Sequence, residues 1–381
     1  MKILITGDFC PIGRNKKAIQ EGQFTKLLGG LESTIRDADL AITNLECPLT
    51  NAANPIQKSG PAIKSSPDAV NALSFAGFHL VTLANNHILD YGAQGLTDTI
   101  NVCKEANIDY VGAGNNVEEA RRPFCFSKDG KKVAIINIAE NEFGNTTGNY
   151  PGGNPLNLVD NYYDIKTAKE NADFLIVIFH GGREHYQLPS PRIQQLFRYF
   201  IDIGADVVVS HHTHCYSGYE RYNDKLIFYG LGNFIFDYKK KYQKGLWTEG
   251  YALSLHISDD NIQFELIPFY QGRKDNPCLR LLNKSEKTKF YQHIEQLNTI
   301  ISDEQQLYKA WEEYVKTQRL NYLGLLAISN KYIRELIRRK LLPKWLLKLN
   351  AHSIVQLNLL RCETHRDLMI TTLENEIYHK N

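Results

Sequence analysis

The sequence lacks the features that would place it in several protein classes. Its 44 lysines and arginines nearly balance 42 aspartates and glutamates, which leaves a formal net charge of +2. Chains that coat nucleic acid are usually far more basic, so we expect no nucleic-acid partner. The 381 residues are 43% hydrophobic and 23% charged. This composition excludes collagen-like, disordered and disulfide-scaffold classes and is sufficient for a sizeable core.

Signals for membranes and secretion are also scarce. No apolar run approaches the roughly 18–20 residues of a membrane-spanning helix. The first apolar run, residues 3–5, is too short for a signal peptide and predicts a buried first strand instead. The 7 cysteines are scattered, with no Cys-x-x-Cys pair, as is typical of reduced thiols. We therefore expect a cytoplasmic protein.

Residues 1 to about 270 alternate short runs rich in Val and Ile with helix-length segments such as 95–106 and 190–203. Such runs are typical of strands buried on both faces, and their alternation with helices indicates an α/β fold. Turn residues at 128–130, 223–224 and 258–261 predict antiparallel hairpins. The predicted buried strands are residues 3–6, 40–44, 80–83, 110–111, 133–138, 174–179 and 207–210.

The amino-acid composition changes near residue 283, where Gly and Pro become rare and Leu, Lys, Glu, Gln and Arg recur at helical spacing. We expect a body of residues 1–275 and a C-terminal helical extension of residues 283–381. No Ser/Gly-rich linker separates them, so the extension should pack on the body. Residues 331–349 are basic, with interleaved Leu and Trp345. They would make peripheral contact with an anionic membrane or, in the reading we favour, pack as a solvated helix on the body.

Polar side chains follow five of the predicted strands, where ligands bind in α/β sheets. Each alone has a structural explanation, such as a turn at Gly7–Asp8 or a hydrogen-bonded surface histidine. Their coincidence indicates a metal site, because carboxylate, amide and imidazole groups suit Mn²⁺, Fe²⁺ or Zn²⁺. These candidate ligands are Asp8, Glu46, Asn86, His180, His212 and His214.

The spacing of two histidines suggests two metal ions. His212 and His214 could each serve one of the two ions, and Asp8 or Glu46 could bridge the ions. Two metals about 3.5–4 Å apart clamp the attacking and leaving oxygens of phosphoester hydrolysis. Two divalent cations with two carboxylates would leave the site positive, which favours an anionic small-molecule or polymer substrate.

At this point the sequence resembles the capsule-synthesis CapA family, within the calcineurin-like metallophosphatase superfamily. The resemblance covers about two-thirds of the chain, from Met1 to about Phe269. The motifs that carry it are Gly7–Asp8, Asn44–Leu45–Glu46, Ala84–Asn85–Asn86–His87, Asp90–Tyr91–Gly92, Tyr110–Val111–Gly112–Ala113–Gly114, His180–Gly181–Gly182 with Glu184, Gly204–Ala205–Asp206–Val207–Val208–Val209, His212–Thr213–His214 and Tyr229–Gly230–Leu231–Gly232–Asn233–Phe234.

The resemblance implies a fold and a set of roles. The fold is a metallophosphatase-like two-sheet β-sandwich flanked by helices, in four layers. Asp8 and His214 would ligate the first metal, and Glu46 would bridge. Asn86, His180 and His212 would ligate the second metal. His87 would protonate the leaving oxygen or contact the phosphate, and water activated by the metals would be the nucleophile.

The chain also departs from the superfamily pattern. An Asp-x-His sequence usually follows the first strand, whereas this chain has Asp8–Phe9–Cys10. Cys10 is either a thiolate ligand or, in the reading we favour, a packing residue. Arg14 and Glu184 are candidate substrate-binding residues, with a cap or a salt bridge as the structural alternative.

The sequence therefore predicts a metal-dependent hydrolase, most simply a phosphoesterase, acting in capsule or other surface-polymer synthesis such as that of poly-γ-glutamate. Amide hydrolysis is open to the same type of site. The alternative is a non-catalytic, metal-containing module that binds an anionic polymer or a synthase partner. The sequence leaves the oligomeric state open.

Overall fold

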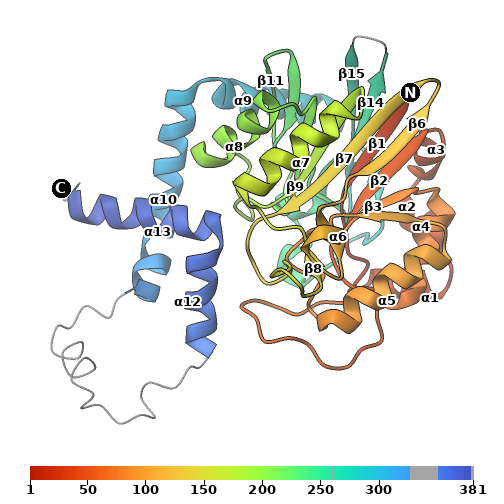
Figure 1. The fold of residues 1–381 in the computed structure, drawn as a ribbon, viewed down its shortest axis with the longest axis horizontal. Coiled ribbons are helices and arrows are strands. Elements are labelled where there is room, and N and C mark those ends of the chain that lie inside the picture. The colour runs from red at the N-terminus through yellow and green to blue at the C-terminus, as the bar shows by residue number, and fades with distance from the viewer. Residues whose placement is uncertain (259–260, 327–350, 379–381) are drawn as a thin grey trace.

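Two β-sheets pack face to face at the centre of the fold, with helices on both outer sides (Figure 1). The computed structural model describes residues 1–258, 261–326 and 351–378. The larger sheet has the order β16-β15-β14-β1-β2-β3-β4, with β13 also paired to β1. Its strands are β1 Lys2–Phe9, β2 Leu40–Leu45, β3 Leu80–Thr82, β4 Asp109–Val111, β13 Asn233–Ile235, β14 Glu249–Ile257, β15 Ile262–Tyr270 and β16 Arg280–Leu281.

The second sheet has the order β11-β12-β10-β9-β7-β6. Strands β7, β9, β10 and β12 run parallel, and β6 and β11 pair antiparallel at the two edges. Its strands are β6 Phe124–Lys128, β7 Lys131–Ala139, β9 Phe174–His180, β10 Val207–His211, β11 Tyr219–Tyr222 and β12 Lys225–Phe228. A small two-stranded sheet joins β5 Ala113–Gly114 to β8 Gly152–Gly153.

The alternation of side chains along each strand builds the layers, because successive residues point to opposite faces. In β1, Ile3 and Ile5 belong to the core cluster that the second sheet shares, whereas Leu4 belongs to the cluster beneath the outer helices. In β2, Ala41 likewise faces outwards. The structure is thus the predicted two-sheet sandwich flanked by helices, and its layers are helix, sheet, sheet, helix.

The helices of the body cover both outer faces (Figure 1). Helices α1 to α5 supply buried residues to the cluster outside the larger sheet, and α7 and α8 pack on the second sheet. Their bounds are α1 Asn15–Gln20, α2 Phe24–Leu28, α3 Glu32–Arg36, α4 Val70–Ala76, α5 Gly92–Glu105, α6 Val117–Arg121, α7 Leu158–Glu170 and α8 Pro191–Asp202, with short 3-10 turns at Pro67–Ala69, Lys240–Tyr242 and Gly245–Thr248.

Beyond residue 283, most of the described residues lie in helices, and these helices contact the body. Gln194 of α8 donates to the Ile301 carbonyl at 2.8 Å, and Asn141 donates to Glu363 at 2.7 Å. A separate small apolar cluster, centred on Trp311 and Leu368, joins the later helices. The extension comprises α9 Lys284–Ser302, α10 Glu304–Leu326, α12 Ala351–Arg361 and α13 Glu363–Tyr378. The basic segment 331–349 lies outside the described residues.

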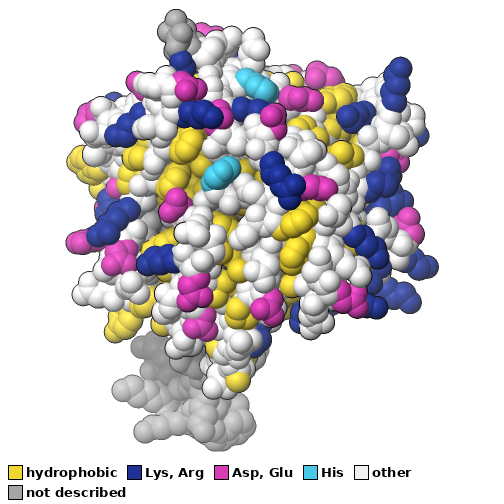
Figure 2. Space-filling view, turned by 90° about the vertical axis from the view of Figure 1, so that its right-hand side faces the viewer, with side chains coloured by type: hydrophobic (Ala, Val, Ile, Leu, Met, Phe, Trp, Pro, Cys, Tyr) yellow, Lys and Arg dark blue, Asp and Glu magenta, His cyan; other side chains and the backbone are white. Residues whose placement is uncertain are grey.

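The predicted strands are present, and their ends differ from the predicted bounds by only a few residues. The runs expected at 3–6, 174–179 and 207–210 become β1, β9 and β10, and all three expected hairpins form. Within the described ranges, no helix combines the length and hydrophobicity needed to cross a bilayer. On the face shown in Figure 2, basic and acidic side chains are interspersed, in keeping with the balanced composition.

Candidate metal centre

The carboxyl ends of five central strands meet between the two sheets. Strands β1, β2 and β3 run parallel in the larger sheet, and β9 and β10 run parallel in the second. Parallel strands end at one edge of a sheet, so the polar residues that follow them converge. The structure brings together all six side chains predicted as ligands: Asp8, Glu46, Asn86, His180, His212 and His214.

These side chains form two groups that share one carboxylate. Glu46, His180 and His212 place one ligand atom each within 4.8 Å of one another, as do Asp8, Glu46 and His214. Glu46 Oε1 lies 3.6 Å from His180 Nε2 and 3.8 Å from His214 Nε2. Asn86 Oδ1 lies 3.1 Å from His180 Nε2, on the side of the first group. The two groups of possible ligand atoms are adjacent, and Glu46 belongs to both.

Buried oxygens without partners show that the donor set fits metal ions. Glu46 is fully buried, and neither of its carboxylate oxygens has a hydrogen-bond partner. Asp8 Oδ2 is in the same situation. A buried unpaired carboxylate costs several kcal/mol unless a cation compensates it. Oxygen and imidazole nitrogen donors are those that Mn²⁺, Fe²⁺ and Zn²⁺ accept.

A glycine forces the first ligand into place. The β1 ladder is irregular between Thr6 and Asp8, and the backbone at Gly7 approaches the Gly232 carbonyl closely. A Cβ at residue 7 would lie 1.8 Å from that oxygen, so only glycine fits. Irregularities of this kind re-aim side chains at strand ends. Here the result is that Asp8 points into the space between the sheets.

The two C-terminal ligand histidines adopt an unusual backbone conformation. His212 has φ +85° and His214 has φ +54°. Left-handed conformations cost non-glycine residues about 1–3 kcal/mol and cluster at functional sites. The backbone is therefore not extended here, where side chains two residues apart would otherwise lie on the same side. The imidazoles reach different groups, because the positive φ angles turn the backbone between them.

Electrostatics couple the ligands. Burial, followed by the nearby Asp8 charge, raises the pKa of Glu46 well above its usual range. Burial and the neighbouring His212 lower the pKa of His180 well below its usual range. Burial opposes the charged form of His214, but Asp8 and Glu184 outweigh it and raise the pKa of that imidazole. The pKa of each of these side chains therefore depends on the charges of its neighbours.

Asparagines orient the ligands. Asn44 donates to Asp8 Oδ1 at 2.8 Å and lies 3.2 Å from His180 Nδ1. Asn233 Oδ1 lies 3.0 Å from His214 Nδ1. Outer partners of this type orient ligand rings. Asn44 belongs to one of the motifs on which the family resemblance rests, but the sequence analysis did not assign it this positioning role. Its position at the end of a buried strand could have indicated the role.

His87 belongs to a buried hydrogen-bonded group beside the ligands. Its Nδ1 lies 2.6 Å from Asp90 Oδ2, and Asp90 Oδ1 accepts from Lys58 Nζ at 2.6 Å. Lys58 also donates to the Asn86 carbonyl at 2.7 Å. Burial and the Lys58 charge lower the pKa of His87, although Asp90 opposes them. The sequence missed Lys58, since nothing in its loop distinguishes it from a solvated lysine.

Three other sequence candidates lie outside the two ligand groups. Cys10 is fully buried in the apolar cluster beneath the outer helices, in keeping with the packing interpretation. The Arg14 guanidinium donates to Asp237 at 2.7 Å and to backbone carbonyls of residues 272–274. Glu184 lies in the loop after β9, with its side chain 44% exposed, near His185. A substrate contact of Arg14 or Glu184 stays a prediction.

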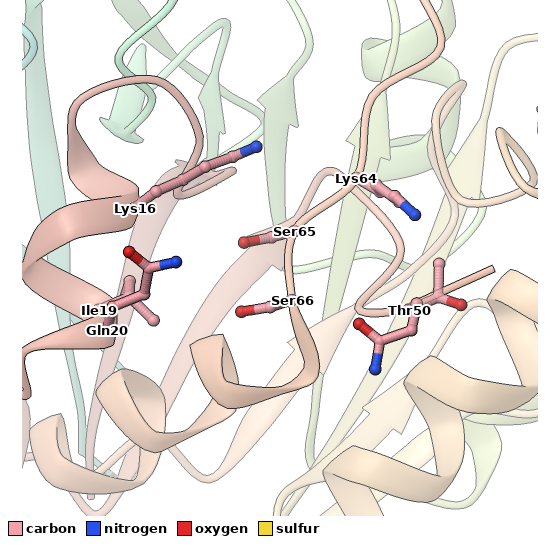
Figure 3. Close-up of a pocket in the computed structure, with 8 residues that line it drawn as sticks. Lys16, Ile19, Gln20, Thr50, Lys64, Ser65 and Ser66 are labelled. Atoms are coloured by element: carbon pink, nitrogen blue, oxygen red, sulfur yellow. The ribbon is translucent and has the colours of Figure 1, made fainter. Parts of the chain in front are cut away.

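A polar cavity of about 200 Å³ adjoins the segments that continue from Asp8 and Glu46. Ser65 Oγ donates to the Pro11 carbonyl and its backbone N–H to the Pro48 carbonyl. The Ser65 and Ser66 hydroxyls point towards α1, the helix that carries Lys16 (Figure 3). The lining residues are Lys16, Ile19, Gln20, Thr50, Asn51, Lys64, Ser65 and Ser66.

Comparison with solved structures finds loosely similar folds. A hypothetical protein from Thermus thermophilus superposes with a TM-score of 0.43 at 15% identity, covering 70% of this chain and 99% of that one. A 5′-nucleotidase from Candida albicans gives a TM-score of 0.40 at 11% identity, covering 83% of this chain and 58% of that one. The family assignment rests instead on the sequence matches.

Two curated relatives are similar to the body of the chain. The capsule biosynthesis protein CapA of Bacillus anthracis is 37% identical over 212 residues, which are 53% of this chain and 52% of the relative. The PGA biosynthesis protein CapA of Bacillus subtilis is 34% identical over 215 residues, 54% of this chain and 56% of the relative. The matches span about half the length of each relative. The model of the bacterial capsule synthesis protein family PGA_cap matches residues 2–238, and the chain therefore belongs to that family.

Proposed function

We propose that this protein is a two-metal hydrolase, and specifically a phosphoesterase, that acts in the synthesis of a capsule or another surface polymer. The observation that carries the proposal is the buried Glu46 carboxylate, which lies between two groups of ligand atoms and has no hydrogen-bond partner of its own. The names of the relatives, which refer to capsule and PGA biosynthesis, support the biological setting.

Each of the two groups of candidate ligands would hold one metal ion. Glu46, Asn86, His180 and His212 would hold one ion, and Asp8, Glu46 and His214 the other. When bound, two divalent ions polarise a phosphoester and activate water. Asn44 and Asn233 would keep the carboxylate and imidazole donors in position, since they already hold Asp8 and His214.

His87 would assist the leaving group. Asp90 binds the Nδ1 side of the ring, which leaves Nε2 as the nitrogen available to a substrate. Lys58 holds Asp90 and the Asn86 backbone together, and so ties this histidine to a ligand. A positioned histidine of this type contributes about 10²–10⁴-fold to the rate.

The substrate would be anionic. Four formal positive charges from two divalent ions exceed the two negative charges of Asp8 and Glu46. The polar cavity near α1 is lined by two lysines, Lys16 and Lys64, whose positive charges would favour an anionic chain there.

The test measures metal content together with hydrolysis of an aryl phosphomonoester, an aryl phosphodiester and a γ-glutamyl anilide in the presence of Mn²⁺. We expect about two metals per chain and turnover of a phosphoester. Asp8→Ala should lose metal and activity, whereas His87→Ala should keep its metal and lose about 10²–10⁴-fold in rate. His256→Ala, an exposed histidine, is the matched control.

The outcomes separate the alternatives. Turnover of the anilide alone would replace the phosphoesterase with an amidase. Metal binding without turnover of any of the three, together with binding of an anionic polymer that His87→Ala leaves intact, would overturn the enzyme in favour of a binding module. The cytoplasmic location stays a prediction.

A further inference from the structure

A second cluster of metal-ligating side chains lies away from the candidate metal centre, where the C-terminal extension meets the body. Glu142, Cys362 and His365 each place one ligand atom within 4.8 Å of the others. His365 Nε2 is 3.8 Å from Glu142 Oε1. Cys362 is 2% exposed, and the Glu142 and His365 side chains are 12% and 21% exposed. The cluster is thus shielded but reachable from solvent.

Two segments far apart in the sequence build this cluster. Cys362 and His365 lie at the corner between α12 and α13, three residues apart, so that both face the same side of a helical turn. Glu142 lies in the loop after β7. The Arg361 guanidinium donates to the Glu142 carbonyl at 2.9 Å, and Asn141 N–H donates to Glu363 at 3.0 Å across 222 residues of sequence. Backbone and side-chain contacts therefore already hold the two segments in register.

The neighbouring carboxylates have other partners. Glu140 accepts from Arg192 and Thr364, and Glu363 accepts from Asn141. Glu142 is the carboxylate that faces His365. A thiol, an imidazole and a carboxylate converging on one point form a mixed sulfur, nitrogen and oxygen donor set, which suits Zn²⁺ or a similar borderline cation better than Mg²⁺ or Ca²⁺.

We propose that Glu142, Cys362 and His365 bind a Zn²⁺-type cation that fastens the C-terminal extension to the body. This site is separate from the proposed function and does not depend on it. Protein ligands would occupy three positions, and the fourth would be open to water or a further group. The ligand atoms would need to close from 4.8 Å or less towards tetrahedral spacing, a small change for side chains on a loop and a helix corner.

The site is connected to the candidate metal centre, because the loop that carries Glu142 packs against the segment that carries Asn86. The Glu142 loop continues to Gly144, where an added Cβ would lie 2.0 Å from the Asn85 carbonyl. The loop therefore packs directly against the segment that carries Asn86. A cation at Glu142 would hold the extension, this loop and the edge of the candidate metal centre together.

The test uses Co²⁺ as the probe on the untagged full chain, reduced with a phosphine. Thiolate bound to Co²⁺ gives a near-ultraviolet charge-transfer band, and the ligands proposed for the candidate metal centre include no thiolate. We expect this band in the wild-type protein and in Asp8→Ala, and its loss in Cys362→Ser, with one cobalt equivalent fewer. His365→Gln should weaken cobalt binding at least about tenfold.

Controls keep the result specific. Cys125→Ser removes an exposed thiol and Cys10→Ser removes the buried thiol two residues after Asp8, and both should retain the band. If Cys362→Ser does not fold, Glu142→Gln and His365→Gln carry the test. Absence of the band in wild type, or its persistence in Cys362→Ser, would overturn the proposal. Loss of the band in Asp8→Ala but not in Cys362→Ser would likewise overturn it, whatever the activity measurements show.

Discussion

Glu46 Oε1 lies almost equally far from two histidines, 3.6 Å from His180 Nε2 and 3.8 Å from His214 Nε2. His180 is the last residue of β9 and His214 follows β10, both strands of the second sheet, whereas Glu46 follows β2 of the larger sheet. The contact therefore spans the interface between the sheets. It places a buried carboxyl group at the point that both groups share.

Replacing Glu46 with glutamine should weaken metal binding but stabilise the metal-free protein. We expect Glu46→Gln to weaken Mn²⁺ binding at least about tenfold, because both groups lose their shared charge. In chelator-treated protein the same change should raise the free energy of unfolding by about 1 kcal/mol, because it removes a carboxyl group whose ionisation is opposed by burial and by Asp8. Calorimetric titration and thermal melts measure the two effects. Glu265→Gln, at an exposed position, is the control, and a less stable metal-free variant would contradict the argument.

Asp90 should act through His87. Asp90→Asn keeps the shape but removes the charge that binds His87 Nδ1 and Lys58. We expect kcat to fall about 10–100-fold with unchanged metal content. The double variant with His87→Ala should be no slower than His87→Ala alone, because both changes affect one group. Additive losses in the double variant would show that Asp90 works independently, and Asp68→Asn, on the surface, is the control.

Arg14 should contribute to stability. Its guanidinium is one-third exposed, but its partner Asp237 is 1% exposed and would lose its cation. We expect Arg14→Gln to lower the free energy of unfolding by about 1–3 kcal/mol, less than the loss of a fully buried pair. Denaturant melts measure this effect. An unchanged KM is expected in a steady-state assay, and a raised KM with unchanged stability would instead support the substrate contact predicted from the sequence.

The start of α9 should be acid-sensitive. Asn283 and Glu286 form a capping box, and the hydrogen bonds from Arg280 lower the pKa of Glu286 to about 2. A folded-state pKa below the unfolded value stabilises the protein above about pH 4.5, and this stabilisation is lost as the pH falls towards 2. Glu286→Gln should therefore cost about 1 kcal/mol or less at pH 6, because the pair is partly exposed. Its cost should vanish near pH 2.

Melts of wild type and Glu286→Gln between pH 6 and pH 2 test this dependence. Glu295→Gln lies on the exposed side of the same helix and should show no such pH-dependent difference. A difference between Glu286→Gln and wild type that stays constant over the whole range would mean that the carboxylate charge is not responsible.

The sequence by itself determined much of the fold and indicated which polar side chains meet between the sheets. Runs rich in Val and Ile identified β1, β9 and β10, because strands buried on both faces need apolar side chains throughout. Polar residues directly after those runs identified Asp8, His180 and His214, because the carboxyl ends of parallel strands meet. Both inferences depend on short sequence patterns, which do not depend on contacts between distant parts of the chain.

Only the tertiary structure decided how these residues are combined. It made Glu46 the shared carboxylate, turned His212 and His214 through positive φ angles, and buried Lys58 against Asp90. It also brought Glu142 to Cys362 and His365. These relationships depend on how sheets and helices pack across long stretches of chain, and no local periodicity encodes the distance between two side chains that meet only in the folded state.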